Sequence, residues 1–117
     1  NNNKGISITV GCTNPNIIYN NYISGNGINV EDKGSTFWNT PILPGPNIIG
    51  GLNISGNYFS DYEGIDADGN GFGDTPYNIL GGSNQDINPL AIPEVPTIFL
   101  SIGMMFLSLI KMKRKIN

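Results

Sequence analysis

The sequence predicts an all-β chain, and within that class a parallel β-helix, from three observations. First, one twelve-residue pattern occurs twice, as PNIIYNNYISGN in residues 15–26 and as PNIIGGLNISGN in residues 46–57, with eight identical positions. Second, apolar and polar residues alternate with the two-residue period of strands, and not with the helical period. Third, Asn and Gly separate these segments, and both tolerate the backbone angles of tight corners. A repeat of about 20 to 50 residues is typical of solenoid proteins.

A second, shorter similarity supports this interpretation. Residues 5–8 read GISI and residues 27–30 read GINV, 22 positions later. In a parallel β-helix, one or two Ile or Val side chains from each coil fill the interior, and stacked Asn side chains can form ladders at the corners. The alternative is an antiparallel β-sandwich with a hairpin turn at Asn26 and Gly27. Hairpin sheets do not require a repeat, so the repeat favours the β-helix.

The chain divides into three predicted parts. Residues 1–60 are expected to form β-helix coils, residues 61–91 an Asp-rich cap, and residues 92–117 a Pro-containing linker, a transmembrane helix and a basic tail. Because the sequence begins at Asn1 without an initiator Met, we expect further coils upstream. Stacking between neighbouring coils stabilises repeat arrays of this kind.

Charge is distributed unevenly along the chain. Residues 1–94 contain two Lys and nine acidic residues, a net charge of −7, whereas residues 95–117 carry four basic residues and no acid, a net charge of +4. Nucleic-acid binding depends on Lys and Arg that neutralise phosphates, so the acidic body argues against a nucleic-acid partner. An acidic body suits divalent cations instead.

Residues 95–110 form an uncharged, mostly apolar run that is followed directly by the basic sequence KMKRK. As a helix this run would be about 24 Å long, short of a bilayer core of about 30 Å, and flanking Lys side chains can reach the interface. Its apolar residues surround the whole helix, whereas the alternative, an amphipathic helix of a soluble domain, would have one apolar face. Positive charge stays on the cytoplasmic side, so we expect a transmembrane anchor with the body outside the cell.

The linker itself contains a motif. Residues 93–98 read PEVPTI, which resembles the archaeal sorting signal whose motif is Pro-Glu-Phe, one of the tripartite C-terminal signals read by sortase-like enzymes. Val95 stands where that signal has Phe. Processing at such a signal would replace the helix by a lipid or wall anchor.

An acidic loop provides the candidate metal site. Residues 66–74 read DADGNGFGD, which matches the first nine positions of an EF-hand-type loop, with Gly71 at the turn. Calcium takes about six to eight oxygen ligands, and this spacing directs several of them at one point. The predicted ligands of a structural Ca²⁺ ion are Asp66, Asp68, Asn70, the backbone carbonyl of Phe72, and Asp74.

The match to an EF-hand loop is incomplete. Position 12 is Tyr77 and not the bidentate Glu, and no helical pattern flanks the loop. We expect a carboxylate from elsewhere, Glu63 or Asp86, to complete the coordination shell. A weak site with a dissociation constant of about 10⁻⁴ to 10⁻³ M would still fill outside the cell. The alternative is a metal-free turn rich in Asp, Asn and Gly.

The second half of the chain presents its motifs in a specific order. They are GNYFSDY at residues 56–62, the acidic loop, TPY at residues 75–77 and DINPL at residues 86–90. This order resembles the closing segment of the NosD-like family of parallel β-helix proteins, which are abundant on archaeal cell surfaces; that family typically has Trp in place of Phe59. The resemblance extends over roughly residues 5–90. It implies a right-handed parallel β-helix in a surface or periplasmic location.

The family takes its name from a periplasmic protein linked to copper-site maturation. Copper sites use His, Cys and Met ligands. This chain has no His, a single Cys at position 12, and three Met residues that all lie in the C-terminal tail, so copper binding is not expected. The single Cys12 also excludes an internal disulfide.

Many β-helix proteins are polysaccharide lyases or glycosidases, which use paired carboxylates or a basic residue beside calcium. Residues 1–94 contain no Arg and only two Lys. Asp61 and Glu63 would share a strand face but border the acidic loop, where a ligand role is favoured. No catalytic residue is therefore predicted in this segment, and catalysis would belong to upstream coils.

The sequence thus favours a membrane-anchored, cell-surface structural or adhesion protein, tethered in the cytoplasmic membrane through residues 95–110. Its expected partners are the membrane and a cell-wall or surface polysaccharide. Aromatic residues could form a stacking surface for sugars, but the sequence favours packing of most of them in the cap. Asn53 begins a glycosylation sequon, which suits a surface protein. The alternatives are a surface carbohydrate-active enzyme whose catalytic coils lie upstream and, third, a periplasmic copper-maturation protein.

Overall fold

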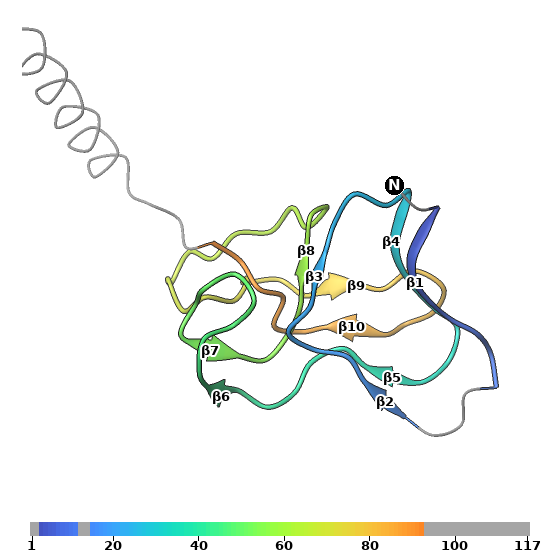
Figure 1. Cartoon of the computed structure of the whole chain (residues 1–117), viewed down its shortest axis with the longest axis horizontal. Coiled ribbons are helices and arrows are strands. Elements are labelled where there is room, and N and C mark those ends of the chain that lie inside the picture. The colour runs from blue at the N-terminus through green and yellow to red at the C-terminus, as the bar shows by residue number, and fades with distance from the viewer. Residues whose placement is uncertain (1–2, 12–14, 93–117) are drawn as a thin grey trace, which may run out of the picture.

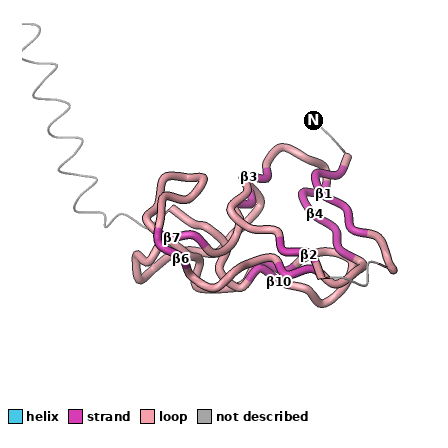
Figure 2. The backbone as a smooth tube through the Cα atoms, turned by 60° about the horizontal axis from the view of Figure 1, so that its bottom comes forward, coloured by secondary structure: helices cyan, strands magenta, loops and turns pink. Residues whose placement is uncertain are grey.

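The described part of the chain consists of short strands joined by turns and loops (Figures 1 and 2). The computed structural model describes residues 3–11 and 15–92. The strands are β1 (Lys4–Ile8), β2 (Asn16–Ile17), β3 (Tyr22–Ile23), β4 (Ile28–Asp32), β5 (Thr36–Phe37), β6 (Leu43–Pro44), β7 (Asn53–Ile54), β8 (Tyr58–Phe59), β9 (Tyr77–Asn78) and β10 (Gln85–Asp86). No residue in the described ranges is helical, which confirms the all-β prediction for this part of the chain.

The C-terminal predictions fall beyond the described part of the chain. Within residues 3–11 and 15–92, no helix is long and apolar enough to cross a membrane. The predicted transmembrane helix at residues 95–110 and the motif at residues 93–98 lie outside the described residues, as does Cys12. The transmembrane helix, the sorting motif and the absence of a disulfide at Cys12 therefore stay predictions.

Three pairs of strands run parallel to each other. β1 pairs with β4 at an offset of 24 residues (4 to 28), β2 with β5 at 20 residues (16 to 36), and β3 with β8 at 36 residues (22 to 58). Parallel strands cannot be joined by a tight hairpin, so the chain must make a longer connection before it returns in the same direction. In the described residues, these connections consist of short strands and corners, and none of those residues is helical (Figure 1).

Asn and Gly occupy corners, as the sequence pattern predicts. Among the described residues, Asn20 is the one non-glycine residue with a positive φ, at 58°. Asn tolerates this left-handed conformation better than other residues with a side chain. The Asn20 Oδ1 atom also accepts a hydrogen bond of 2.7 Å from the backbone N–H of Ile48, so this corner is tied to a distant loop.

The register of the first ladder differs from the one that the sequence similarity suggests. Aligning GISI with GINV would place Ile8 opposite Val30, but the structure places Ile6 opposite Val30 and Ile8 opposite Asp32. Side chains alternate faces with a period of two, so a shift of two residues keeps every side chain on the same face. The similarity identifies the correct strands and faces and misses the pairing by two positions.

The 31-residue repeat likewise does not set a ladder. Its second copy begins in a turn, where the Asn47 carbonyl accepts a bond of 2.9 Å from the N–H of Gly50. It continues into β7, which pairs antiparallel with β6. The chain thus leaves the parallel ladders between residues 40 and 55, a segment called the excursion below. Thr40 and Ser55 join its two ends, because the Thr40 N–H donates to the Ser55 carbonyl at 2.9 Å. Residues 40–55 number 16, which equals the difference between the offsets of 36 and 20 in the β3–β8 and β2–β5 ladders.

The apolar core is small and is assembled from several ladders. Its buried members are Ile23, Val30, Trp38, Phe59 and Ile79. Half-buried side chains that pack against it are Ile6, Ile8, Ile18, Tyr62 and Tyr77. Phe72, Leu90 and Ala91 are buried outside this cluster. Burying a large apolar side chain contributes about 1.5–3 kcal/mol, so this small number of buried residues leaves a large share of the stability to polar contacts.

The β9–β10 hairpin adds a further layer beside β4. β9 pairs antiparallel with β10, and the N–H of Asp32 donates to the Leu80 carbonyl at 2.8 Å. This contact places Ile79 in the core. The ring of Tyr77 stacks on Phe59, with centroids 3.8 Å apart and planes 4° apart.

Asp32 is a fully buried carboxylate that joins β4 to two other segments. Its Oδ2 atom accepts bonds from the Trp38 indole N–H at 2.9 Å and from the Asn84 amide at 2.8 Å. Its Oδ1 atom accepts the backbone N–H of Gly34 at 2.8 Å. Burial by itself would raise the pKa of Asp32, but the bonds from Trp38, Gly34 and Asn84 outweigh burial and hold the pKa below its usual value.

Asn57 is fully buried and connects three separate stretches of backbone. Its Nδ2 group donates to the carbonyls of Ile18 at 2.9 Å and of Trp38 at 2.8 Å. Its Oδ1 atom accepts bonds from the backbone N–H and the side-chain amide of Asn21, at 3.2 Å and 3.0 Å. The Asn21–Asn57 amide pair is an Asn-to-Asn contact of the kind that the sequence predicts between coils.

Asp86, in β10, accepts a hydrogen bond from the backbone of Asn57 itself. Its carboxylate accepts the N–H of Asn57 at 2.7 Å and that of Asn88 at 3.0 Å, and its side chain is fully buried. Burial raises the pKa of Asp86 to about 6, and the N–H groups of Asn57 and Asn88 oppose this rise only in part.

Replacing Asn57 by Ala should destabilise the fold, because the Ile18 and Trp38 carbonyls lose their donor. Each buried group left unsatisfied costs about 1–3 kcal/mol, so we expect the free energy of unfolding of the full chain to fall by about 3 kcal/mol in urea denaturation. Asn16→Ala, at an exposed position of β2, is the matched control and should change it by less than about 0.5 kcal/mol. Equal effects of the two substitutions would contradict this role for Asn57.

Asp86 should make the chain less stable as the pH rises. Its pKa of about 6 in the fold lies above the ordinary value of 3.8, so folding favours the protonated carboxyl group. This contribution is fully present below about pH 4 and is lost as the pH passes about 6; two units correspond to about 3 kcal/mol.

The test compares the full chain with Asp86→Asn, melted in EDTA between about pH 4 and pH 7. The variant should lack the decline in unfolding free energy that Asp86 causes, whatever its absolute stability. Asp32 contributes with the opposite sign but is common to both chains. Parallel curves for the two proteins would show that burial does not raise the pKa of Asp86.

Candidate functional site: an acidic loop

Asp66 begins the acidic loop and is buried, with 1% of its surface exposed. Its Oδ1 atom accepts the backbone N–H of Asn70 at 3.1 Å, and its Oδ2 atom accepts that of Gly71 at 2.8 Å. Gly71 has a φ of 92°, which a residue with a side chain rarely adopts. The loop therefore folds back around the first carboxylate, as the position of Gly71 in the sequence predicts.

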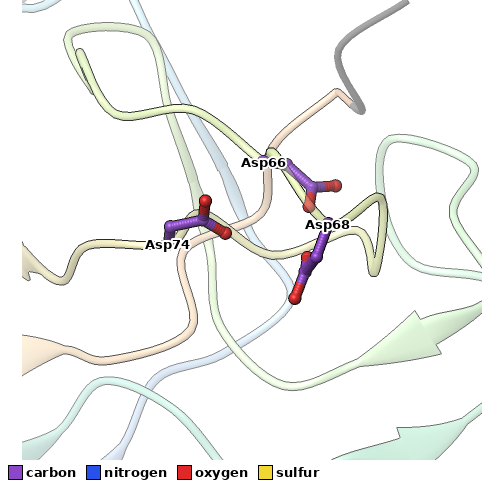
Figure 3. Close-up of side chains that lie close together, drawn as sticks. All are labelled: Asp66, Asp68 and Asp74. Atoms are coloured by element: carbon purple, nitrogen blue, oxygen red, sulfur yellow. The ribbon is translucent and has the colours of Figure 1, made fainter.

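Three carboxylates converge in this loop (Figure 3). One oxygen from each of Asp66, Asp68 and Asp74 lies within 4.8 Å of the others. Figure 3 shows the Asp74 side chain directed toward Asp66 and Asp68 from the returning limb of the loop. Oxygens around one Ca²⁺ ion lie about 2.3–2.6 Å from it, so two ligands on opposite sides are about 5 Å apart. The spacing of the three carboxylates is compatible with a single ion between them.

The backbone next to Phe72 anchors the loop to the chain that follows β10. Phe72 is buried and lies opposite Leu90 in an isolated antiparallel bridge. The two bonds of this bridge run from the Gly73 N–H to the Pro89 carbonyl at 2.8 Å, and from the Ala91 N–H to the Gly71 carbonyl at 3.1 Å. The bridge thus uses groups of Gly71 and Gly73 and not the Phe72 carbonyl, which is the predicted ligand.

The side chain of Asn70 is engaged within the loop. Its Oδ1 atom accepts the N–H of Phe72 at 2.8 Å, and its amide donates to Asp68 at 3.3 Å. The Asp74 carboxylate accepts the N–H of Ala67 at 3.1 Å. These bonds order the loop without a metal, and an oxygen that accepts one hydrogen bond still has a lone pair for a cation.

Tyr62 closes the base of the loop, and the sequence pattern gave it no such role. Its hydroxyl group donates to the backbone carbonyl of Thr75, so it joins the segments on either side of residues 66–74. Gly64 and Gly73 lie so close to this hydroxyl that a Cβ atom at either position would clash with it. The sequence signal for this contact is the pair of glycines, Gly64 and Gly73, because glycine lets another group approach the backbone closely.

The structure brings together some of the predicted ligands. Asp66, Asp68 and Asp74 meet, and Asn70 and Phe72 belong to the same loop. Neither carboxylate expected to complete the shell joins this group: Asp86 binds Asn57 and Asn88, and Glu63 lines a different pocket.

That second pocket has a volume of about 300 Å³ and is mostly polar, with Asp61 and Glu63 in its wall. The Asp61 carboxylate accepts a bond of 2.8 Å from the Asn29 amide and bonds of 3.0 Å from the Tyr77 hydroxyl. Burial and the Asp61 carboxylate raise the pKa of Tyr77, so Tyr77 stays a neutral donor. Both Asn29 and Tyr77 therefore hold the Asp61 carboxylate in place through hydrogen bonds.

Comparison with known proteins places the chain in a family. No curated protein and no solved structure matches it. The family model described as "Periplasmic copper-binding protein (NosD)" matches residues 1–64, more than half of the 117 residues. The match spans β1 to β8 and ends before the acidic loop. The chain belongs to the NosD family.

Proposed function

We propose that this chain is a structural module of the cell surface: parallel β-helix coils, closed by a calcium-binding cap and tethered to the membrane by the C-terminal segment. The observation that carries the proposal is the convergence of Asp66, Asp68 and Asp74 in one loop. Calcium bound there would hold the loop, and with it the closing segment at residues 89–91, in one arrangement. Its role is structural and not catalytic.

The parallel ladders support the β-helix part of the proposal. Three parallel ladders with offsets of 20 to 36 residues, whose described connecting residues form short strands and corners, are what stacked coils require. The excursion at residues 40–55 is an insertion between coils, tied back through Asn20 and Ile48. Insertions of this kind are common on one face of repeat proteins.

The family description and the sequence support a location outside the cytoplasm. The family model is described as periplasmic. An apolar run at residues 95–110 with a basic segment behind it orients the acidic body outward. Extracellular calcium is abundant enough to fill a weak site.

Exposed aromatic residues favour a polysaccharide as the partner of an adhesion-type protein. The rings of Tyr22 and Tyr58 stack with centroids 4.6 Å apart and planes 12° apart. Tyr22 is 59% exposed on this ladder. Aromatic faces provide large contact areas with a polar edge.

Catalysis by the described segment has less support. Glycosidases generally use two carboxylates that act on the substrate, one as general acid and the other as base or nucleophile. Asp61 is instead bound by Asn29 and Tyr77. A carbohydrate-active enzyme remains the alternative only through coils outside this sequence.

Copper, which the family description names, does not fit the residues of this chain. The sequence has no His, and the described ranges contain neither Met nor Cys. The acidic loop offers hard oxygen donors, which suit calcium and not copper. No copper chemistry is therefore proposed for this segment.

A calcium titration of the full chain tests the cap. Calorimetry should give a dissociation constant of about 10⁻⁴ to 10⁻³ M. At a calcium concentration about ten times that value, the free energy of unfolding should rise by about 1.4 kcal/mol. Asp68→Asn combined with Asp74→Asn should abolish both effects, because these exposed side chains supply two of the three converging carboxylates.

The control is Asp61→Asn, which removes an exposed carboxylate outside the loop and should bind calcium like the parent chain. Asp66 is kept in all variants, since its removal would also unfold the loop around Asn70 and Gly71. If a folded chain binds no calcium at concentrations of several millimolar, the acidic loop is a metal-free turn and the proposed calcium site is wrong.

A further inference from the structure

A cavity with a volume of about 490 Å³ lies at the end of the fold that carries the β6–β7 hairpin. Ile49 and Leu52 from the excursion and Ile92 from the end of the described chain line it, together with Gly69 and Gly71 of the acidic loop. No charged residue is among its lining residues, whereas Asp61 lines two other pockets of the described residues.

Two of the apolar side chains at this cavity are largely exposed. Leu52 is 85% exposed and Ile92 is 74% exposed. Single exposed apolar residues are ordinary, but two that line one uncharged cavity mark a surface that favours an apolar contact. Figures 1 and 2 both place this end, with β6 and β7, opposite the end that carries β1 and β4.

The distance along the chain identifies the occupant. Only Pro93 and Glu94 separate Ile92 from the uncharged run that starts at Val95. Three fully extended steps, from position 92 to position 95, span at most about 11 Å. The polar layer on each side of a bilayer core is about 5–8 Å thick, so a chain anchored through residues 95–110 has Ile92 in or next to this layer.

We propose that the cavity end of the fold, defined by Ile49, Leu52 and Ile92, lies against the outer surface of the bilayer. The inference rests on the proposed membrane tether and adds an orientation to it. The cavity wall itself has no charged side chain to desolvate, although Asp68 lies directly beside it and accepts a bond from Asn70, and the apolar side chains enter the headgroup layer. The β1–β4 end then points away from the membrane.

The experiment uses the full chain in phosphatidylcholine vesicles, in a Cys12→Ser background with one introduced cysteine carrying an environment-sensitive fluorophore. The probe stands at Leu52→Cys, and its matched control stands at Val10→Cys, which is 73% exposed beyond β1. We expect the fluorophore at position 52 to be quenched at least about twofold more by spin-labelled lipid than that at position 10, because interfacial side chains enter the membrane by about 5–10 Å. Aqueous iodide should quench position 10 more strongly.

Three results would overturn the inference. Equal iodide quenching at the two positions, in chains that float with the vesicles, would show that this end faces water while the tether holds. Protection from iodide at position 52 without quenching by spin-labelled lipid would assign the cavity to a protein segment or a second copy. A chain that does not float with vesicles would remove the tether and the orientation together.

Discussion

The buried Asn57 side chain is the interaction on which the arrangement of the strands depends. It bonds the backbone at Ile18 and at Trp38, and it pairs with Asn21. Ile18 and Asn21 belong to one pass of the chain and Trp38 to the next, and an apolar side chain could not satisfy the carbonyls of Ile18 and Trp38. Eight of the ten described strands have only two residues and so few ladder bonds each, and side chains must fix the corners between them. Asn suits this position because one amide both donates and accepts.

Two buried carboxylates extend this polar interior in different ways. Asp32 receives three N–H donors and has a lowered pKa, whereas burial dominates at Asp86 and raises its pKa to about 6. Both bind the β9–β10 segment to the parallel ladders, through Asn84 in one case and Asn57 in the other. The acidic loop lies between β8 and β9, so its geometry depends on how this segment is held. A calcium ion at Asp66 would add a constraint to a part of the fold with a small apolar core.

The sequence is informative about element type and less so about pairing. Alternation and Asn-Gly corners predict strands, and the acidic loop folds around Asp66 as its glycine spacing indicates. The repeat copy at residues 46–57 does not stack on the first copy, because residues 40–55 leave the ladder and return at Ser55. The same residues form strand β2 at Asn16–Ile17 in the first copy and a turn at Asn47 in the second, so a repeat alone cannot set register. The sequence likewise offered Asp86 as a metal ligand, because its burial beside Asn57 is a tertiary property.

Parallel stacking of consecutive passes is the central claim, and scalar couplings across hydrogen bonds test it most directly. In the full chain labelled with ¹⁵N and ¹³C, the Tyr58 amide nitrogen should couple to the Asn21 carbonyl carbon, and that of Ser60 to Ile23. Together the two couplings define a parallel ladder between β3 and β8. From the first coupling to the second, the donor moves two residues toward the C-terminus, from Tyr58 to Ser60, and so does the acceptor, from Asn21 to Ile23. Couplings that run in opposite order along the two strands would mean antiparallel pairing and would contradict the account.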